Sequence, residues 1–401
     1  MPRSPLLFTP FLPEQAEDLE DLALEIIKKS AALGARQHQI TLSSLKEMLR
    51  VINSYYSNLI EGHNTHPRDI VRAMRQDYDA EPAKRNLQLE SVAHIRCQQL
   101  MEARLRDESE LLVTSEDFLT FLHSEFYHRI PDDFLVATDP ETGKKSYVVP
   151  GKFREEEVVI GRHVPPCHNE LTRLVDRFAD VYRPNRHHGA KKLLAAAAAH
   201  HRLMWIHPFL DGNGRVARLF TEAYLLKISI EGFGLWSISR GLARKGTAYK
   251  AALSLADEPR RNDLDGRGTL TNKGLTDFCR FFLETCLDQV DYMGSLLQLD
   301  GLINRIQGYI NLRNNNIAPG PEGASPLRVE AGRMLQEVLL HGETARGAVV
   351  RASGLKERTA RNLLAQLLDE GLLLSDSAKG FVRMGFPIHA TGWLFPELYP
   401  R

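Results

Sequence analysis

Residues 207–218, with the sequence HPFLDGNGRVAR, are the most informative segment of this chain. Helical segments flank it on both sides, over residues 191–206 and 215–228. The first is built on a run of alanines, and alanine is the strongest intrinsic helix former. Pro208 disfavours helical geometry at His207, the residue before it. The sequence therefore predicts a helix that ends at His207, a short loop and a new helix.

The loop brings together groups suited to phosphate chemistry. His207 sits at the end of a rigid helix, and Gly212-Asn213-Gly214 leads into a helix start, where backbone N–H groups can approach an anion. Arg215 and Arg218 are three residues apart and share a face of the new helix. Asp211 is a hard carboxylate suited to Mg²⁺. A base, a metal ligand, an N–H nest and two guanidiniums indicate phosphoryl or nucleotidyl transfer.

Each part of the loop also has an ordinary structural explanation. A histidine before a proline is usually structural, Gly-Asn-Gly is a common turn, and arginines three apart usually form a solvated face. Their combination within twelve residues favours a functional site. The site is not a P-loop, because the lysine of GxxxxGK[ST] is missing here.

The segment resembles the signature of the Fic family, HPFx[DE]GNGRxxR, at every defined position. The flanking Trp205-Ile206 and Leu219-Phe220 are also similar to the family, and the resemblance covers roughly residues 40 to 290. It implies a mainly α fold, a Fic-type helical core with a small β-hairpin flap that binds ATP and Mg²⁺.

The resemblance also implies a role for each residue of the loop. His207 would be the general base that takes the proton from a target hydroxyl, and Asp211 would bind Mg²⁺. Gly212, Asn213, Gly214 and Arg215 would cradle the phosphates, and Arg218 would hold the γ-phosphate. The implied activity is transfer of AMP from ATP to a serine, threonine or tyrosine of a target protein, and to the chain itself.

Two further parts of the sequence resemble the surroundings of a Fic site. The extended-looking segment 153–161 is the one convincing strand signal in the first 300 residues, and it resembles the family's flap hairpin. An exposed strand edge there would pair with a target through the docking residues Phe153, Val158, Val159 and Ile160. An ordinary surface hairpin is the alternative. Tyr249 would lie near the adenine, or else be a core tyrosine.

A possible inhibitory element precedes the core. Ser57 and Glu61 are four residues apart near the end of a helix predicted over about 41–60, with Gly62 as its terminator. Ser-x-x-x-Glu alone is very common, but beside the loop it resembles the family's inhibitory motif, [ST]xxxE[GN]. The resemblance implies that Glu61 pairs with Arg218 and keeps ATP in an unproductive pose. Glu61 would alternatively position a water that removes AMP from a modified target.

The chain is predicted to divide into an N-terminal helical region (1–110), a catalytic core (111–310), a linker (311–326) and a C-terminal module with a tail (327–401). Helices over 328–340, 344–352 and 356–370, followed by an extended pair from 372 to 386, predict a winged helix-turn-helix. Lys356, Arg358 and Arg361 begin its recognition helix. From Ser325 onward there are ten Lys or Arg and eight Asp or Glu, a weak charge for DNA binding. Binding of a protein partner, or dimerisation, is an equal alternative.

Composition sets limits on the remaining possibilities. Lys plus Arg and Asp plus Glu both number 51, so no overall field attracts nucleic acid or membranes. Four scattered cysteines indicate reduced thiols in a cytoplasmic protein, with no membrane partner expected. Two rival functions remain. One is a DNA-binding regulator that uses the Fic core as a nucleotide sensor or self-modifying element. The other is a Fic-fold enzyme that transfers a different group.

Overall fold

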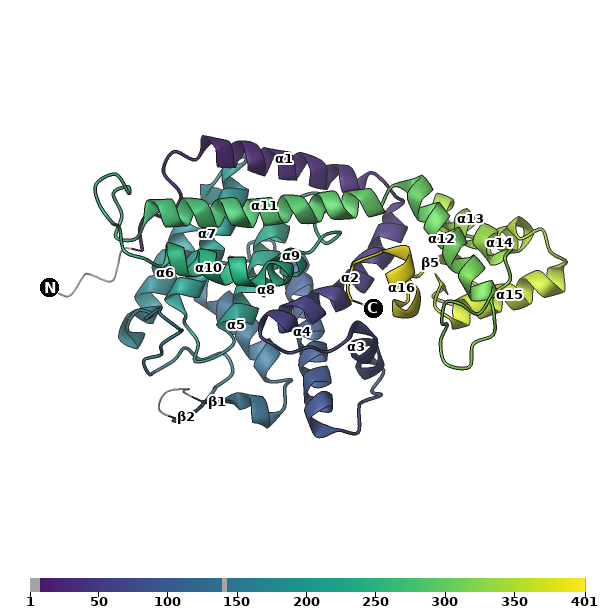
Figure 1. Cartoon of the computed structure of the whole chain (residues 1–401), viewed down its shortest axis with the longest axis horizontal. Coiled ribbons are helices and arrows are strands. Elements are labelled where there is room, and N and C mark those ends of the chain that lie inside the picture. The colour runs from purple at the N-terminus through teal and green to yellow at the C-terminus, as the bar shows by residue number, and fades with distance from the viewer. Residues whose placement is uncertain (1–7, 139–142, 401) are drawn as a thin grey trace. The chain divides into compact units, whose positions relative to one another are not determined.

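The computed structural model describes residues 8–138 and 143–400 (Figure 1). Across these residues it has sixteen α-helices and two small antiparallel sheets, which confirms the predicted mainly α class. The chain forms two compact units. The first contains the described parts of Met1–Lys28, Asn53–Phe233 and Ile238–Gln289, and the second those of Lys29–Ile52, Gly234–Ser237 and Val290–Arg401. None of the helices in the described ranges is long and apolar enough to cross a bilayer.

The first unit is a helical assembly with one short hairpin. Its complete α-helices are α3 (Pro67–Met74), α4 (Pro82–Asp107), α5 (Glu116–Tyr127), α6 (Leu171–Val181), α7 (Lys191–Ile206), α8 (Asn213–Lys227), α9 (Ile238–Arg244) and α10 (Gly246–Ala256). Helices α1 (Glu17–Gly34), α2 (Gln39–Ile60) and α11 (Asn272–Leu296) have residues in both units. Three 3₁₀ turns are η1 (Asp132–Leu135), η2 (His168–Glu170) and η3 (Pro184–Arg186). Strands β1 (Val136–Thr138) and β2 (Lys145–Tyr147) pair antiparallel.

Helices α7 and α8 form the centre of this unit. They pack on each other, while α4 and α5 pack on α8 and α6 packs on α7. The alanine run 195–199 is fully buried, and these small side chains let the neighbouring helices approach closely. Helix α7 ends at Ile206, and His207 follows in the left-handed region at φ 50° and ψ 60°. The predicted helix end and the helix–loop–helix arrangement are therefore confirmed.

The predicted strand over residues 153–161 is wrong. These residues form no strand, and only an isolated bridge joins Ile160 to His163, whereas the hairpin of the unit is β1–β2. The reason is local hydrogen bonding: the Arg154 N–H donates to the Pro208 carbonyl at 2.9 Å, and its guanidinium donates to the carbonyls of Glu156 and Pro166. A side chain thus binds the carbonyl groups that a neighbouring strand would otherwise bind.

The second unit contains the C-terminal module. Its elements are α12 (Leu299–Asn314), α13 (Ala331–His341), β3 (Glu343–Thr344), α14 (Arg346–Ala352), α15 (Glu357–Asp369), β4 (Leu373–Leu374), β5 (Val382–Met384) and α16 (Ile388–Leu394). The strands form one antiparallel sheet in the order β3-β5-β4. Figure 1 shows α12 to α15 grouped in the green-to-yellow part of the chain. This is the predicted order of elements, but the winged helix itself remains a prediction. Helix α12 ends at Asn314, four residues into the predicted linker.

Candidate active site

A cavity of about 660 Å³ in the first unit gathers most of the predicted site residues. Its lining includes Glu61, Ile160, His207, Asp211, Gly212, Asn213, Gly214, Arg218 and Tyr249. Met204, Lys250, Leu253, Ser254, Asp257 and residues 160–163 complete most of the wall. Arg215, Ser57, Phe153, Val158 and Val159 are not part of this lining.

His207 is neutral and oriented for use as a base. Its Nδ1 lies 3.2 Å from the Met204 carbonyl, which can only accept, so Nδ1 carries the ring proton and Nε2 presents a lone pair. The residue is only 8% exposed, and burial lowers its pKa to about 4. The lone pair on Nε2 is therefore available at neutral pH.

His123, a buried histidine on α5, contacts the loop through Phe209 and Asp211. The His123 ring stacks between Tyr127 at 4.3 Å and Phe209 at 4.0 Å between ring centroids. Its Nδ1 accepts from the Gly151 N–H at 2.8 Å, so its Nε2–H donates to the Asp211 carbonyl at 3.3 Å. Burial lowers the pKa of His123 to about 4, and the ring therefore stays neutral.

The metal-ligand candidate and its neighbours are held by side-chain hydrogen bonds. The Tyr127 hydroxyl donates to Asp211 Oδ2 at 2.8 Å. Gly212 has a φ of +79°, and a Cβ on it would lie 2.5 Å from the Tyr127 ring, so only glycine fits there. The Asn213 side chain accepts from the Phe209 N–H at 2.9 Å and donates to the Phe209 carbonyl at 2.8 Å. Asn213 thus shapes the loop with its side chain and offers its backbone to the cavity.

Arg218 is held by both residues of the predicted inhibitory motif. Its guanidinium donates to Ser57 Oγ at 2.9 Å, to the Ser57 carbonyl at 3.0 Å and to Glu61 Oε1 at 2.6 Å. A Cβ on Gly214 would lie 2.5 Å from Glu61 Oε1, so the carboxylate lies against the loop backbone. Burial acts to raise the pKa of Glu61, but the guanidiniums of Arg218 and Arg215 outweigh it and lower that pKa. Glu61 is therefore an anion that lines the cavity beside Arg218 and Gly214.

Arg215 points elsewhere. It forms an ion pair with Glu90, its guanidinium carbon lies 5.2 Å from the Phe126 ring centroid, and it contacts His63 Nδ1 at 3.3 Å. His63 Nδ1 is also 2.7 Å from the second oxygen of Glu90. The predicted phosphate ligand is thus a buried member of an ion-pair network outside the cavity lining.

Tyr249 lies in the cavity wall and ends a chain of hydrogen bonds. The Thr221 hydroxyl donates to the Ala217 carbonyl at 2.7 Å, so its oxygen accepts from His200 Nδ1 at 2.7 Å. His200 Nε2 then accepts from the Tyr249 hydroxyl at 2.7 Å. Burial lowers the pKa of His200 to about 3, which keeps the ring neutral. The chain fixes Tyr249 against α8, the helix that carries Arg218.

Arg154 connects segment 153–166 to the loop. Its side chain is fully buried, and Nε donates to the His207 carbonyl at 2.9 Å. The ring of Phe153 packs on Phe209 at 5.3 Å, so this residue is not on an exposed strand edge as predicted. Val159 and Ile160 are 58% and 43% exposed, and of these two only Ile160 reaches the cavity.

Sequence reasoning missed the residues that position the loop, namely Glu90, His63, His123, Tyr127 and Arg154. His123 and Tyr127 are four residues apart and share a face of one helix, and this spacing is the one signal for them in the sequence. The others come from segments whose proximity to the loop no local pattern reveals.

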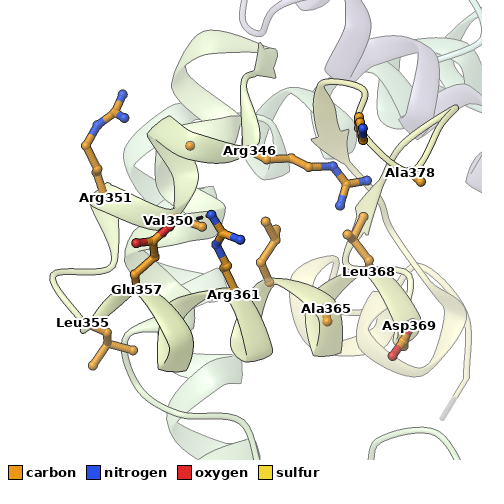
Figure 2. Close-up of a pocket in the computed structure, with 13 residues that line it drawn as sticks. Arg346, Val350, Arg351, Leu355, Glu357, Arg361, Ala365, Leu368, Asp369 and Ala378 are labelled. Carbon is orange, nitrogen blue, oxygen red and sulfur yellow. Dashed lines mark hydrogen bonds and ion pairs between the residues drawn. The ribbon is translucent and has the colours of Figure 1, made fainter.

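A second cavity, of about 850 Å³, lies in the second unit between α14, α15 and the turn after β4. Figure 2 shows Arg346 and Arg361 projecting into it, with Ala365 and Leu368 on the α15 side. Arg351 and Lys379 also line it, as do the acidic Glu357 and Asp369. Arg346 donates to the carbonyls of Ser377 and Gly380 at 3.0 and 3.1 Å, which fixes the turn against α14.

Comparison with known proteins points to one family. Residues 113–225 match the Fic/DOC family. The chain is 31% identical over 173 residues to protein adenylyltransferase Fic of Nematostella vectensis, an alignment covering 43% of this chain and 36% of that protein. It is 40% identical over 118 residues to the protein of the same name from Drosophila willistoni, covering 29% and 20%. The alignments thus span about a third and a fifth of these relatives.

Solved structures show the same fold. A Fic domain containing signaling protein from Bacteroides thetaiotaomicron superposes with a TM-score of 0.52 at 18% identity, covering 69% of this chain and 98% of that one. A Fic family protein from Desulfovibrio desulfuricans G20 superposes with a TM-score of 0.50 at 16% identity, covering 91% and 96%.

Proposed function

We propose that this chain, whose residues 113–225 match the Fic/DOC family, is a protein adenylyltransferase that moves AMP from ATP to a serine, threonine or tyrosine hydroxyl. The observation that carries the proposal is His207. His207 is a neutral base whose Nε2 has an available lone pair. It lies six residues before the N-terminus of α8, where backbone N–H groups can bind phosphate. Similarity to proteins named protein adenylyltransferase Fic supports the same chemistry.

In the proposed reaction His207 Nε2 takes the proton of the incoming hydroxyl. The hydroxyl oxygen attacks the α-phosphorus, the bond from that phosphorus to its bridging oxygen breaks, and pyrophosphate leaves. A positioned base of this kind contributes roughly 10²–10⁴-fold to the rate. The first N–H groups of α8 have no partner within the helix and would bind the phosphates, together with Arg218. Arg215 supports this helix end from its pair with Glu90.

Asp211 is suited to hold Mg²⁺. Its carboxylate lies in the cavity wall, and the Tyr127 hydroxyl on Oδ2 orients Oδ1 as the metal-binding oxygen. The ion would neutralise charge on the phosphates of ATP.

We further propose that Glu61 inhibits this activity. Its carboxylate occupies Arg218 and lies against Gly214, where the γ-phosphate would be held. Its side chain is still 31% exposed, so a competing phosphate has access to it. The same carboxylate can position a water for removal of AMP from a modified target, so both the transfer and the removal of AMP have to be measured.

The test uses ATP labelled on the α-phosphate and the full chain. Glu61→Gly should increase labelling of the chain and of lysate proteins, and Glu61→Gly/His207→Ala should abolish it. Glu108→Gly is a matched control, because Glu108 also follows a helix end and pairs with Arg104 on the surface. Labelling that survives in the His207→Ala background would disprove the mechanism, and no gain with Glu61→Gly would disprove the inhibition. Release of AMP from a labelled target by wild-type but not Glu61→Gly protein would assign the removal reaction.

The mass added to the protein distinguishes transfer of AMP from transfer of another group. Intact-mass analysis after incubation with ATP, UTP, CTP and GTP distinguishes added AMP, UMP and phosphate. The complete GNGR-x-x-R pattern, with Arg218 in the cavity, favours AMP.

The second candidate function is nucleic-acid binding by the second unit. It is favoured by the cavity of Figure 2, into which Arg346 and Arg361 project from two helices. Lys379, from the turn after β4, also lines this cavity. Salt-dependent gel-shift binding of duplex DNA that is lost in Arg358→Ala/Arg361→Ala would support it. Binding that is absent at low salt would reject it, because phosphate contacts are strongest there.

A further inference from the structure

A cluster of three metal-ligating side chains lies outside the proposed transfer site. Glu157, Cys167 and His168 each offer one donor atom, and these atoms all lie within 4.8 Å of one another. Among residues 8–138 and 143–400, no other group of three or more His, Cys, Asp or Glu brings its donor atoms this close together. Cys167 and Glu157 are exposed, so an ion can reach them from solvent.

Arg154 holds the two segments of the cluster together. Its buried guanidinium donates to the carbonyls of Glu156 and Pro166, which directly precede Glu157 and Cys167. Nη1 also contacts Glu157 Oε2 at 3.4 Å, which leaves Oε1 facing His168 Nδ1 at 2.8 Å. A carboxylate oriented by a hydrogen bond to its second oxygen is typical of protein metal ligands. The site is therefore organised by a residue that is itself rigidly buried.

We propose that Glu157, Cys167 and His168 bind a zinc ion, with water as the fourth ligand. A thiolate, an imidazole and a carboxylate suit Zn²⁺, whereas Mg²⁺ and Ca²⁺ prefer oxygen ligands alone. Ligands about 2.0–2.3 Å from tetrahedral zinc are about 3.3–3.7 Å apart, so small side-chain rotations from the observed positions suffice. On binding, the Cys167 thiol releases its proton to solvent. Nδ1 of His168, which donates to Glu157 Oε1 in this structure, gives up its proton, and the neutral ring that binds zinc carries its proton on Nε2. One thiolate and one carboxylate then balance the charge of the ion.

The position of this site gives it a consequence for the cavity. Glu157 and Cys167 lie at the two ends of the stretch that supplies residues 160–163 to the cavity wall. Zinc would tie these ends together and hold the stretch in place. Zinc binding itself does not depend on the proposed transfer of AMP.

The first test measures metal binding by the metal-free full chain. Titration against a fluorescent zinc chelator should show one ion per chain, and Co²⁺ in its place should give the near-ultraviolet absorption of a thiolate–cobalt bond. Cys167→Ser and His168→Ala should each weaken binding by about tenfold or more. His188→Ala is the matched control, because His188 is exposed and lies outside the cluster. Equal affinity in wild type and Cys167→Ser, or cobalt without the thiolate band, would overturn the proposal.

The second test measures zinc binding at this site in the wild-type chain. Cys97, Cys279 and Cys286 are buried and Cys167 is exposed, so iodoacetamide should label Cys167 selectively in the folded chain. Zinc should slow that labelling and also slow tryptic cleavage after Arg162, within the tied stretch. Unchanged rates of both at saturating zinc would contradict the proposal.

Discussion

Arg215 and Arg218 are one turn apart on α8, but they pair with different carboxylates in different surroundings. Arg218 faces the cavity and pairs with Glu61, whose side chain a ligand can reach. Arg215 pairs with Glu90 where the two side chains are 7% and 1% exposed, and Arg215 does not line the cavity. Both guanidiniums are buried, so the difference lies in their partners: the Glu61 side chain is 31% exposed and the Glu90 side chain only 1%.

Removal of Glu90 should therefore destabilise the fold. In Glu90→Ala the buried guanidinium of Arg215 loses its partner, which typically costs about 3–5 kcal/mol. Urea unfolding followed by circular dichroism measures this loss. Glu108→Ala removes a surface partner of Arg104 and should cost no more than about 1 kcal/mol. Similar losses in the two variants would show that the Glu90–Arg215 pair is not a structural element.

The loop of the candidate site could be predicted because its chemical groups are contiguous. Residues 207–218 carry the candidate base, the candidate metal ligand, a turn and two guanidiniums in one segment, and the helices on both sides follow from alanine content and Pro208. Its supports could not be predicted in the same way. Glu90, His123 and Arg154 reach the loop only through tertiary packing, and each has an ordinary local sequence context.

At the scale of elements, segment 153–166 shows how a side chain can replace a strand partner. Its composition is that of a strand, with Val158, Val159 and Ile160 in a row. Arg154 instead binds carbonyl groups of the segment itself and of His207, and the only ladder-like pairing is the Ile160–His163 bridge. β-propensity describes how well side chains suit the pleated surface of a sheet. A strand also needs a neighbouring strand edge to pair with.

Arg154→Lys should loosen this element and leave the helices intact. Lysine keeps the charge but has no planar fork, so it cannot bind the His207, Glu156 and Pro166 carbonyls together. Hydrogen exchange measured by mass spectrometry should become faster in peptides covering 155–166, with no change in α7. Lys152→Arg is the control, because the described contact of the Lys152 side chain is an exposed ion pair with Glu155. Exchange that is unchanged in Arg154→Lys would mean that other contacts hold the segment.

In the molecule as a whole, the proposed transfer site and the proposed zinc site both belong to the first unit. Each compact unit is assembled from three separate stretches of chain. Predicted boundaries follow the chain from one linker to the next, so they cannot reveal such an assembly. Hydrophobic periodicity gives the helices, but which helices share a core depends on contacts between residues far apart in sequence.

Four buried histidines make the stability of the first unit dependent on pH. Burial lowers the pKa of His94 and His200 to about 3 and of His123 and His207 to about 4. In the unfolded chain each has its ordinary pKa of about 6.5. Between about pH 6.5 and 4 the unfolded chain therefore binds protons that the folded chain does not. Stability must fall as the pH falls through this window, by up to about 1.4 kcal/mol per pH unit for each histidine.

The measurement is urea unfolding at pH 7.0, 6.0 and 5.0, with the free energy of unfolding plotted against pH. We expect a steep fall from pH 6 to 5, and a slope smaller by about one proton in His94→Gln, because one buried titrating group is removed. His188→Ala should leave the slope unchanged, since His188 is exposed in the folded chain. Glu61 and Asp257, whose pKa values are lowered, add their loss only at lower pH, where their carboxylates become protonated. A free energy that stays level from pH 7 to 5 would show that these histidines titrate in the folded chain with the same pKa as in the unfolded chain, and that burial does not keep His207 neutral below about pH 6.5.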